Sequence, residues 1–132
     1  MCLYTTEKRA AKAKKSITCY KVVRRFNSIY AVVYSTPVFT SLYHDFEYRP
    51  GKLRREKKFK CMPRESGAVY FGFHSYATLH AAHIWAGPDD VILKCEIPDS
   101  SRYYTSITGE EYCSNRIKVL AWRKAKERKW HS

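Results

Sequence analysis

Hydrophobic and polar residues alternate along much of the chain, which is the pattern of β-strands with one buried face. Residues 17–26 (ITCYKVVRRF) alternate in this way and are rich in β-branched side chains, so they predict a first strand. Residues 29–35 (IYAVVYS) follow a turn signal at 27–28 and predict its hairpin partner. Pro37 ends this second strand, because proline cannot donate a hydrogen bond to the ladder.

The rest of the chain predicts further strands and one helix. Residues 78–86 predict the helix, with Thr78 as its N-cap and Gly87-Pro88 as its stop. Gly72 predicts a bulge or a close backbone approach inside a strand. Strands or short extended pieces are expected at 46–48, 67–76, 90–97, 101–106 and 116–122, and a loop is expected over the stretch SITGEEYCSNR.

These elements predict an α+β fold, a mostly antiparallel sheet of about five to seven strands with one main helix and basic terminal segments. The length of 132 residues predicts one domain over 1–132. It would comprise a basic N-terminal segment (1–16), a folded core (17–122) with a basic loop (52–60), and a basic C-terminal tail (123–132). The N-terminal segment contains good helix formers but no apolar face, so we expect a helix there only on binding.

Charge adds to this picture, because the formal net charge of +13 is concentrated in three short runs. Residues 7–15 and 123–130 each carry five cations and one acid, and residues 52–60 (KLRREKKFK) carry six cations and one acid. Residues 61–122 carry five cations and seven acids, so the body of the domain is close to neutral. Concentrated like charge destabilises a compact state, so each run is either solvated or in contact with an anionic partner.

Convergence of the three runs would create a patch that binds nucleic acid by releasing counterions from its phosphates. Aromatic residues beside cations, such as Tyr103 next to Arg102, could also stack on bases, although tyrosines on a sheet serve equally well in packing. The partner would be nucleic acid, with RNA favoured, or a host nucleoprotein. The candidate contact residues are Lys52, Arg54, Arg55, Lys57, Lys58, Lys60, Arg123, Lys124, Lys126, Arg128 and Lys129.

Cysteine usage and hydropathy indicate a cytoplasmic location. The five cysteines are odd in number and include no CxxC pair, and the first apolar run is not followed by a signal-peptide cleavage site. We therefore expect reduced thiols in the cytoplasm, which is the host cell cytoplasm if a phage encodes the chain. No apolar run of membrane-spanning length occurs, so no membrane partner is expected.

No motif predicts a metal or a cofactor. His80 and His83 share a face of the expected helix and could hold zinc with Cys95, but the spacing matches no familiar zinc signature. Glycine-rich phosphate loops and a nucleophile elbow are both absent from the sequence. Glu110-Glu111 could act in acid–base chemistry or could be a solvated loop pair.

The stretches MCLYT, CYKVV, FGFHSY, KCEIPDSSRYY and EYCSNRIKV together resemble a family of small proteins from phages and mobile elements of Bacteroidetes. The resemblance covers roughly residues 1–6, 17–26 and 67–120 and carries over no activity. It implies a setting in phage–host conflict. The long basic insert and the basic C-terminus look particular to this member.

A weaker similarity is to ADP-ribosyltransferase folds. Lys21 stands where such folds have an arginine, Ser75 lies near the middle serine motif, and Glu110 or Glu111 would be the acid. Two of these three positions depart from the pattern, because lysine offers no bidentate fork and the serine pair is missing. The resemblance therefore implies a possible nucleotide cleft, built from Lys21, His74, Ser75, Tyr103 and Glu111.

We thus expect a non-enzymatic phage-type accessory protein that binds nucleic acid or a nucleoprotein, a concrete version being an inhibitor of a CRISPR-type host defence complex. The alternatives are an ADP-ribosyltransferase-like enzyme and a sponge for a small nucleotide signal. Nucleic-acid binding requires the basic runs to share a face. The enzyme requires Lys21, His74 or Ser75, and one of the two glutamates to converge in a pocket.

Overall fold

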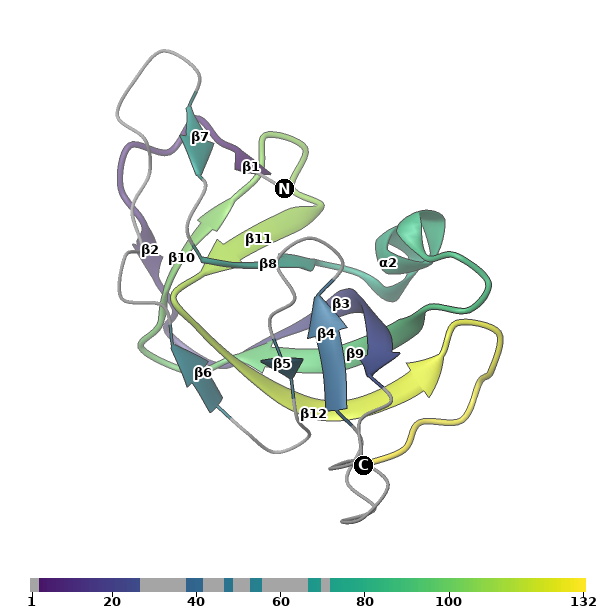
Figure 1. Ribbon diagram of the computed structural model, residues 1–132. Coiled ribbons are helices and arrows are strands. Elements are labelled where there is room, and N and C mark those ends of the chain that lie inside the picture. The colour runs from purple at the N-terminus through teal and green to yellow at the C-terminus, as the bar shows by residue number, and fades with distance from the viewer. Residues whose placement is uncertain (1–2, 27–37, 42–46, 49–52, 56–66, 70–71) are drawn as a thin grey trace.

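The computed structural model describes residues 3–26, 38–41, 47–48, 53–55, 67–69 and 72–132 (Figure 1). Seven of the described strands have four residues or more, and α2 is the one helix within the described ranges, so the expected α+β fold with a mostly antiparallel sheet is confirmed. The elements are β1 (Leu3–Tyr4), β2 (Ala11–Lys12), β3 (Ile17–Phe26), β4 (Val38–Ser41), β5 (Glu47–Tyr48), β6 (Leu53–Arg55), β7 (Ala68–Val69), β8 (Phe73–Tyr76), α2 (Leu79–Trp85), β9 (Val91–Ile97), β10 (Arg102–Thr105), β11 (Glu111–Ser114) and β12 (Arg116–Lys124).

One antiparallel sheet organises the domain. Its strands lie in the order β2-β10-β11-β8-β3-β9-β12-β6. Outside this order, β4 pairs with the C-terminal part of β3, and β5 pairs with β4. A separate two-stranded sheet pairs β1 with β7. The strand order brings segments from both ends of the chain together, because β2 pairs with β10 and the late strands β9 and β12 lie beside β3 and β6.

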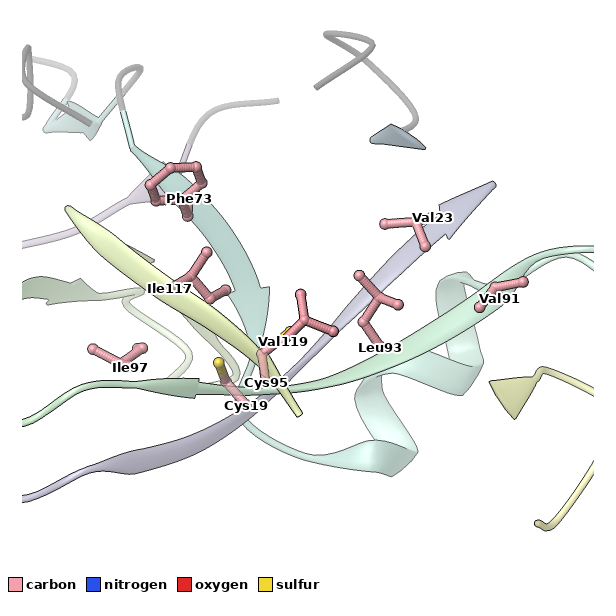
Figure 2. Close-up of a cluster of buried hydrophobic side chains, with 9 residues drawn as sticks. All are labelled: Cys19, Val23, Phe73, Val91, Leu93, Cys95, Ile97, Ile117 and Val119. Atoms are coloured by element: carbon pink, nitrogen blue, oxygen red, sulfur yellow. The ribbon is translucent and has the colours of Figure 1, made fainter. Parts of the chain in front are cut away.

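The main core lies on one face of this sheet, which we call the inner face. Alternate residues of β3, such as Cys19 and Val23, meet Cys95 and Val91 directly opposite them on β9. Directly opposed residues of antiparallel strands share a face, so the alternation seen in the sequence places all of them in one cluster. The cluster comprises Cys19, Val23, Phe73, Val91, Leu93, Cys95, Ile97, Ile117 and Val119 (Figure 2).

Helix α2 covers part of the opposite face, which we call the outer face. The Thr78 hydroxyl accepts a hydrogen bond from the Ala81 amide at 3.1 Å, so the expected N-cap is confirmed. Ala81 and Ala82 are buried against Val22 and Ile92, the residues that alternate with the inner-face positions of β3 and β9. A third cluster, made of Leu3, Val69, Tyr104 and Cys113, lies where β1 and β7 cover β10 and β11.

Several predicted elements are confirmed at or near their predicted bounds. The strand at 17–26 is β3, the helix is α2, and the strands at 90–97 and 116–122 are β9 and β12. The predicted hairpin partner at 29–35 lies outside the described residues.

Other predicted elements differ from the structure. The stretch 67–76 forms two strands in different sheets, β7 and β8, with Gly72 between them at a φ of 133° that favours glycine. The stretch around Glu111 is not a continuous loop, because Glu111–Ser114 form strand β11 and Arg116 begins β12. Three residues of the expected basic loop form β6, and the N-terminal segment contributes the short strands β1 and β2, where no strand was predicted. In each case backbone pairing with a distant strand prevails over local propensity.

Gly67 is expected to tolerate substitution less well than Gly109, although both have positive φ. Its φ is +60°, and a Cβ there would lie 2.4 Å from the Thr5 carbonyl oxygen, where Thr5 N also donates to Gly67 O at 3.0 Å. Gly67→Ala should therefore cost more than about 2 kcal/mol and detach β1 from β7. Gly109→Ala is the control. Its φ is +76°, but an added Cβ would contact no other atom, so the cost should be about 1 kcal/mol. Equal losses of unfolding free energy in urea would contradict this.

The described segments contain no helix with the length and apolarity needed to cross a membrane.

Candidate nucleic-acid interface

Two cross-strand pairs of like charge stand out on the outer face of the sheet. Lys12 of β2 lies directly opposite Arg102 of β10, and Arg55 of β6 lies directly opposite Arg116 of β12. Like charges directly opposite each other destabilise an antiparallel pair. We call these four residues the basic corner.

Hydrogen bonds hold the two pairs of the basic corner close together. The Arg102 amide donates to Asn115 Oδ1 at 2.9 Å, and the Asn115 amide donates to the Arg102 carbonyl at 3.0 Å. Arg116 follows directly, and its guanidinium donates to Ser101 Oγ at 3.2 Å and to the Asp99 carbonyl at 2.7 Å. The start of β12 is therefore fixed against the start of β10, although these strands are not neighbours in the sheet.

The charge of the basic corner is not neutralised by an ion pair with any carboxylate that the structure describes. Within the segments that the structure describes, none of its four side chains forms an ion pair with a carboxylate. Lys12, Arg55 and Arg102 are exposed, and Arg116 is half-buried because its guanidinium caps the 99–101 turn. The corner is thus a concentrated cationic surface with three freely accessible side chains.

The structure locates only part of the basic run 52–60. Arg54 and Arg55 lie in β6 at the edge of the sheet, and Arg55 is exposed within the basic corner. Lys52, Lys57, Lys58 and Lys60 lie outside the described residues.

The C-terminal cations divide into one buried and four exposed side chains. Arg123 is 9% exposed, and its guanidinium contacts His83 Nε2 at 2.7 Å and the Arg128 carbonyl at 3.3 Å. It also stacks 4.8 Å from the centre of the Trp130 ring. Its guanidinium is therefore used inside the fold, where it anchors the C-terminal turn. The exposed cations are Lys124, Lys126, Arg128 and Lys129.

The residues of the expected nucleotide cleft lie on two sides of the sheet. Ser75 is opposite Tyr112, and Tyr103 stacks edge-on against Tyr112 at 5.9 Å, so these side chains lie on the inner face with Lys21. His74 is opposite Cys113, and its Nε2 lies 3.7 Å from Cys113 Sγ on the outer face.

Glu111 is opposite Tyr76 and shares that outer face. The sheet therefore separates Lys21, Ser75 and Tyr103 from the imidazole of His74 and the carboxylate of Glu111.

Lys21 and Ser75 are buried next to the core. Lys21 is 8% exposed, and its ammonium donates to the His74 carbonyl, which joins β3 to β8. Burial raises the pKa of the Cys19 thiol to about 11, and weaker contacts with Ser75 and Lys21 lower it only in part. The Ser75 hydroxyl makes no hydrogen bond of standard geometry with described residues, so its contact with Cys19 is weak. A thiol held protonated in this way is a packing group and a poor nucleophile.

Desolvation and the neighbouring Glu110 carboxylate raise the pKa of Glu111 above its usual value of 4.5. A carboxyl group with a raised pKa stabilises the fold when protonated, and this contribution is lost as pH rises through the folded-state value. Glu111→Gln is therefore expected to be more stable than the wild type at pH 7, with a gain that shrinks towards pH 4. Thermal melts across this range measure the effect, and Asp89→Asn, at an exposed carboxylate, is the control for removal of a charge. A gain that grows on acidification would contradict this.

The histidines that the structure describes do not assemble a metal site with other described residues. His83 accepts from Arg123, so its Nε2 is occupied by a protein donor. His80 is exposed on α2, and among the described residues no group of three histidine, cysteine or acidic side chains is placed to hold a metal ion. Cys19, Cys95 and Cys113 are buried thiols in the reduced state.

Sequence reasoning missed the main feature of the basic corner. Lys12 belongs to the basic run 7–15, but Arg102 and Arg116 lie in the near-neutral stretch 61–122. Neither arginine lies in a basic run, and only the strand register brings them against Lys12 and Arg55. Comparisons of the chain with family models, with curated proteins and with solved structures found no match.

Proposed function

We propose that this protein binds nucleic acid through the basic corner and acts without catalysing a reaction. The observation that carries the proposal is the pair of like-charge contacts, Lys12 with Arg102 and Arg55 with Arg116. Among the described residues neither repulsive pair has an ion-paired carboxylate, so the binding of a polyanion would relieve the repulsion. Phosphates supply such charge at close spacing, and their counterions are released on binding.

The net charge of +13 supports the same function over a longer range, because it steers the protein towards polyanions. The resemblance to phage and mobile-element proteins suggests the setting. In that setting the nucleic acid would be RNA or part of a host nucleoprotein, and occlusion of a CRISPR-type defence complex would be the outcome. The separation of the cleft residues by the sheet gives the enzyme and sponge alternatives no comparable support.

A competing explanation for the cations is protection of sheet edges. β2 and β6 are the two ends of the strand order, and charged side chains on edge strands prevent edge-to-edge aggregation. That role needs no partner. Binding measurements separate the two explanations, because edge protection predicts no affinity for nucleic acid at physiological salt.

The test is fluorescence anisotropy with labelled single-stranded RNA, duplex RNA and duplex DNA, titrated from low to physiological salt. Submicromolar affinity that persists at physiological salt would support the proposal, and the slope of log affinity against log salt would count the phosphate contacts. Affinity that disappears as salt rises would show that the binding is nonspecific electrostatic attraction, and it would contradict the proposal.

A further inference from the structure

The outer face of β3, β9, β12 and β6 forms a continuous surface that ends at the basic corner. Tyr20 of β3 is directly opposite Lys94 of β9, and Lys94 is opposite Ala121 of β12. In the next row, Glu96 lies between Thr18 and Lys118.

One row further along β12, Arg116 faces Arg55. Successive rows on one face are about 7 Å apart and neighbouring strands about 4.8 Å apart, so two rows and two strands place Arg116 about 17 Å from Tyr20.

An aromatic pair lies at the other end of the surface. The Tyr20 and Trp130 rings are 6.2 Å apart, and both are half-buried at the border of the cluster under α2. Trp130 is held there by Arg123, which stacks on its ring. Figure 1 shows β6 beside one end of β12 and the C-terminal turn at the other end. The surface therefore has aromatic rings at one end and cations at the other.

We infer that this surface binds single-stranded nucleic acid, with one or two bases stacked on the Tyr20–Trp130 pair and the backbone following Lys94 and Lys118 to the basic corner. This inference rests on the proposed function and specifies its substrate class. Sites for single strands combine a cationic track with aromatic rings, because every base has a face that stacks. A sheet face that carries aromatic residues is a recurring platform for unpaired RNA bases.

Charge complementarity and the aromatic rings together identify the occupant. Among its described residues, the surface holds the cations Lys94, Lys118, Arg116 and Arg55 and the acid Glu96. An acidic protein would match the cations equally well but would have no flat ring for the Tyr20–Trp130 pair. A duplex keeps its bases stacked inside and so could use only the cationic half of the surface.

The experiment compares a 12-nucleotide labelled poly-U RNA with a 12-base-pair RNA hairpin, using the full chain at constant salt. The wild type should bind the single strand more tightly than the hairpin, with quenching of tryptophan fluorescence by the single strand. Tyr20→Leu keeps an apolar side chain of similar burial but removes the ring. It should lower single-strand affinity roughly 5- to 100-fold and leave hairpin affinity unchanged.

Two matched variants make the result decisive. Tyr20→Phe keeps the ring and should bind the single strand within about threefold of the wild type. Trp85→Leu removes a tryptophan that is 66% exposed on α2, outside this surface, and should bind as the wild type does. Thermal melts confirm that each variant is folded before its affinity is interpreted.

The outcomes separate this inference from the proposed function. Equal affinity for both probes with no effect of Tyr20→Leu would overturn the inference and leave the proposed function intact. Loss of affinity in Trp85→Leu alone would overturn it in favour of a platform on α2. No binding of either probe by the wild type at low salt would overturn both.

Discussion

A triple variant with Lys12, Arg55 and Arg102 changed to Gln is expected to lose most of its affinity for RNA while becoming more stable. Three lost phosphate contacts should lower affinity roughly 10²- to 10³-fold at about 0.1 M salt and reduce the salt slope by about three. The same changes remove both like-charge contacts, Lys12 with Arg102 and Arg55 with Arg116. The free energy of unfolding should rise by about 0.5–2 kcal/mol, since each repulsive pair costs a fraction of this.

Anisotropy titrations and urea denaturation measure the two effects separately. The control changes Lys8, Arg9 and Lys15 to Gln, which alters the net charge equally but removes exposed cations that have no directly opposed cation on a neighbouring described strand. This control should lose less affinity and gain no stability. Unchanged affinity in the first variant would remove the basic corner from the function. A loss of stability would show that its cations serve the fold.

Arg123→Ala is expected to destabilise the domain by about 2–4 kcal/mol, because it removes charge-assisted hydrogen bonds and a cation–π contact from a buried position. The guanidinium joins three parts of the chain: His83 of α2, the Arg128 carbonyl and the Trp130 ring. Without it, the C-terminal turn should separate from the sheet. Amide hydrogen exchange at His131, which donates to the Trp122 carbonyl at 2.8 Å, should then become fast.

Two neighbouring variants test this role. Lys124→Ala removes an exposed cation whose contact with Glu127 is 4.0 Å, and it should change stability by less than about 0.5 kcal/mol. Arg123→Lys keeps the charge but lacks the planar fork, so it should restore little of the lost stability. Full stability in Arg123→Lys would mean that charge alone anchors the turn.

The sequence predicted well those elements whose local pattern agrees with their final environment. β3 alternates over its full length, and its inner positions meet the alternate residues of β9, so period and packing agree. α2 has a capping threonine and a Gly-Pro stop, and the structure uses the cap directly. Such signals depend on residues within a few positions of one another, and they can be evaluated before the fold is known.

The sequence predicted less well the elements whose partners are distant. β6 and β2 are short, charged segments with no strand pattern of their own, and they are strands because β12 and β10 pair with them. The stretch before Asn115 contains loop-like residues, yet Glu111 begins a strand because β8 and β10 lie on either side. Backbone hydrogen bonds across a sheet depend weakly on side-chain type, so local composition does not determine them.

The same distinction applies to function. The sequence by itself determined the excess of positive charge, its concentration in short runs and the alternation that makes a mostly antiparallel sheet. Only the tertiary structure decided which cations face each other, because register brings Arg102 and Arg116 from the neutral body to Lys12 and Arg55. It also buried Arg123 within the C-terminal basic run and placed Lys21 and Glu111 on opposite faces. The physical reason is that charge is a property of single residues, whereas a site is a property of long-range pairing.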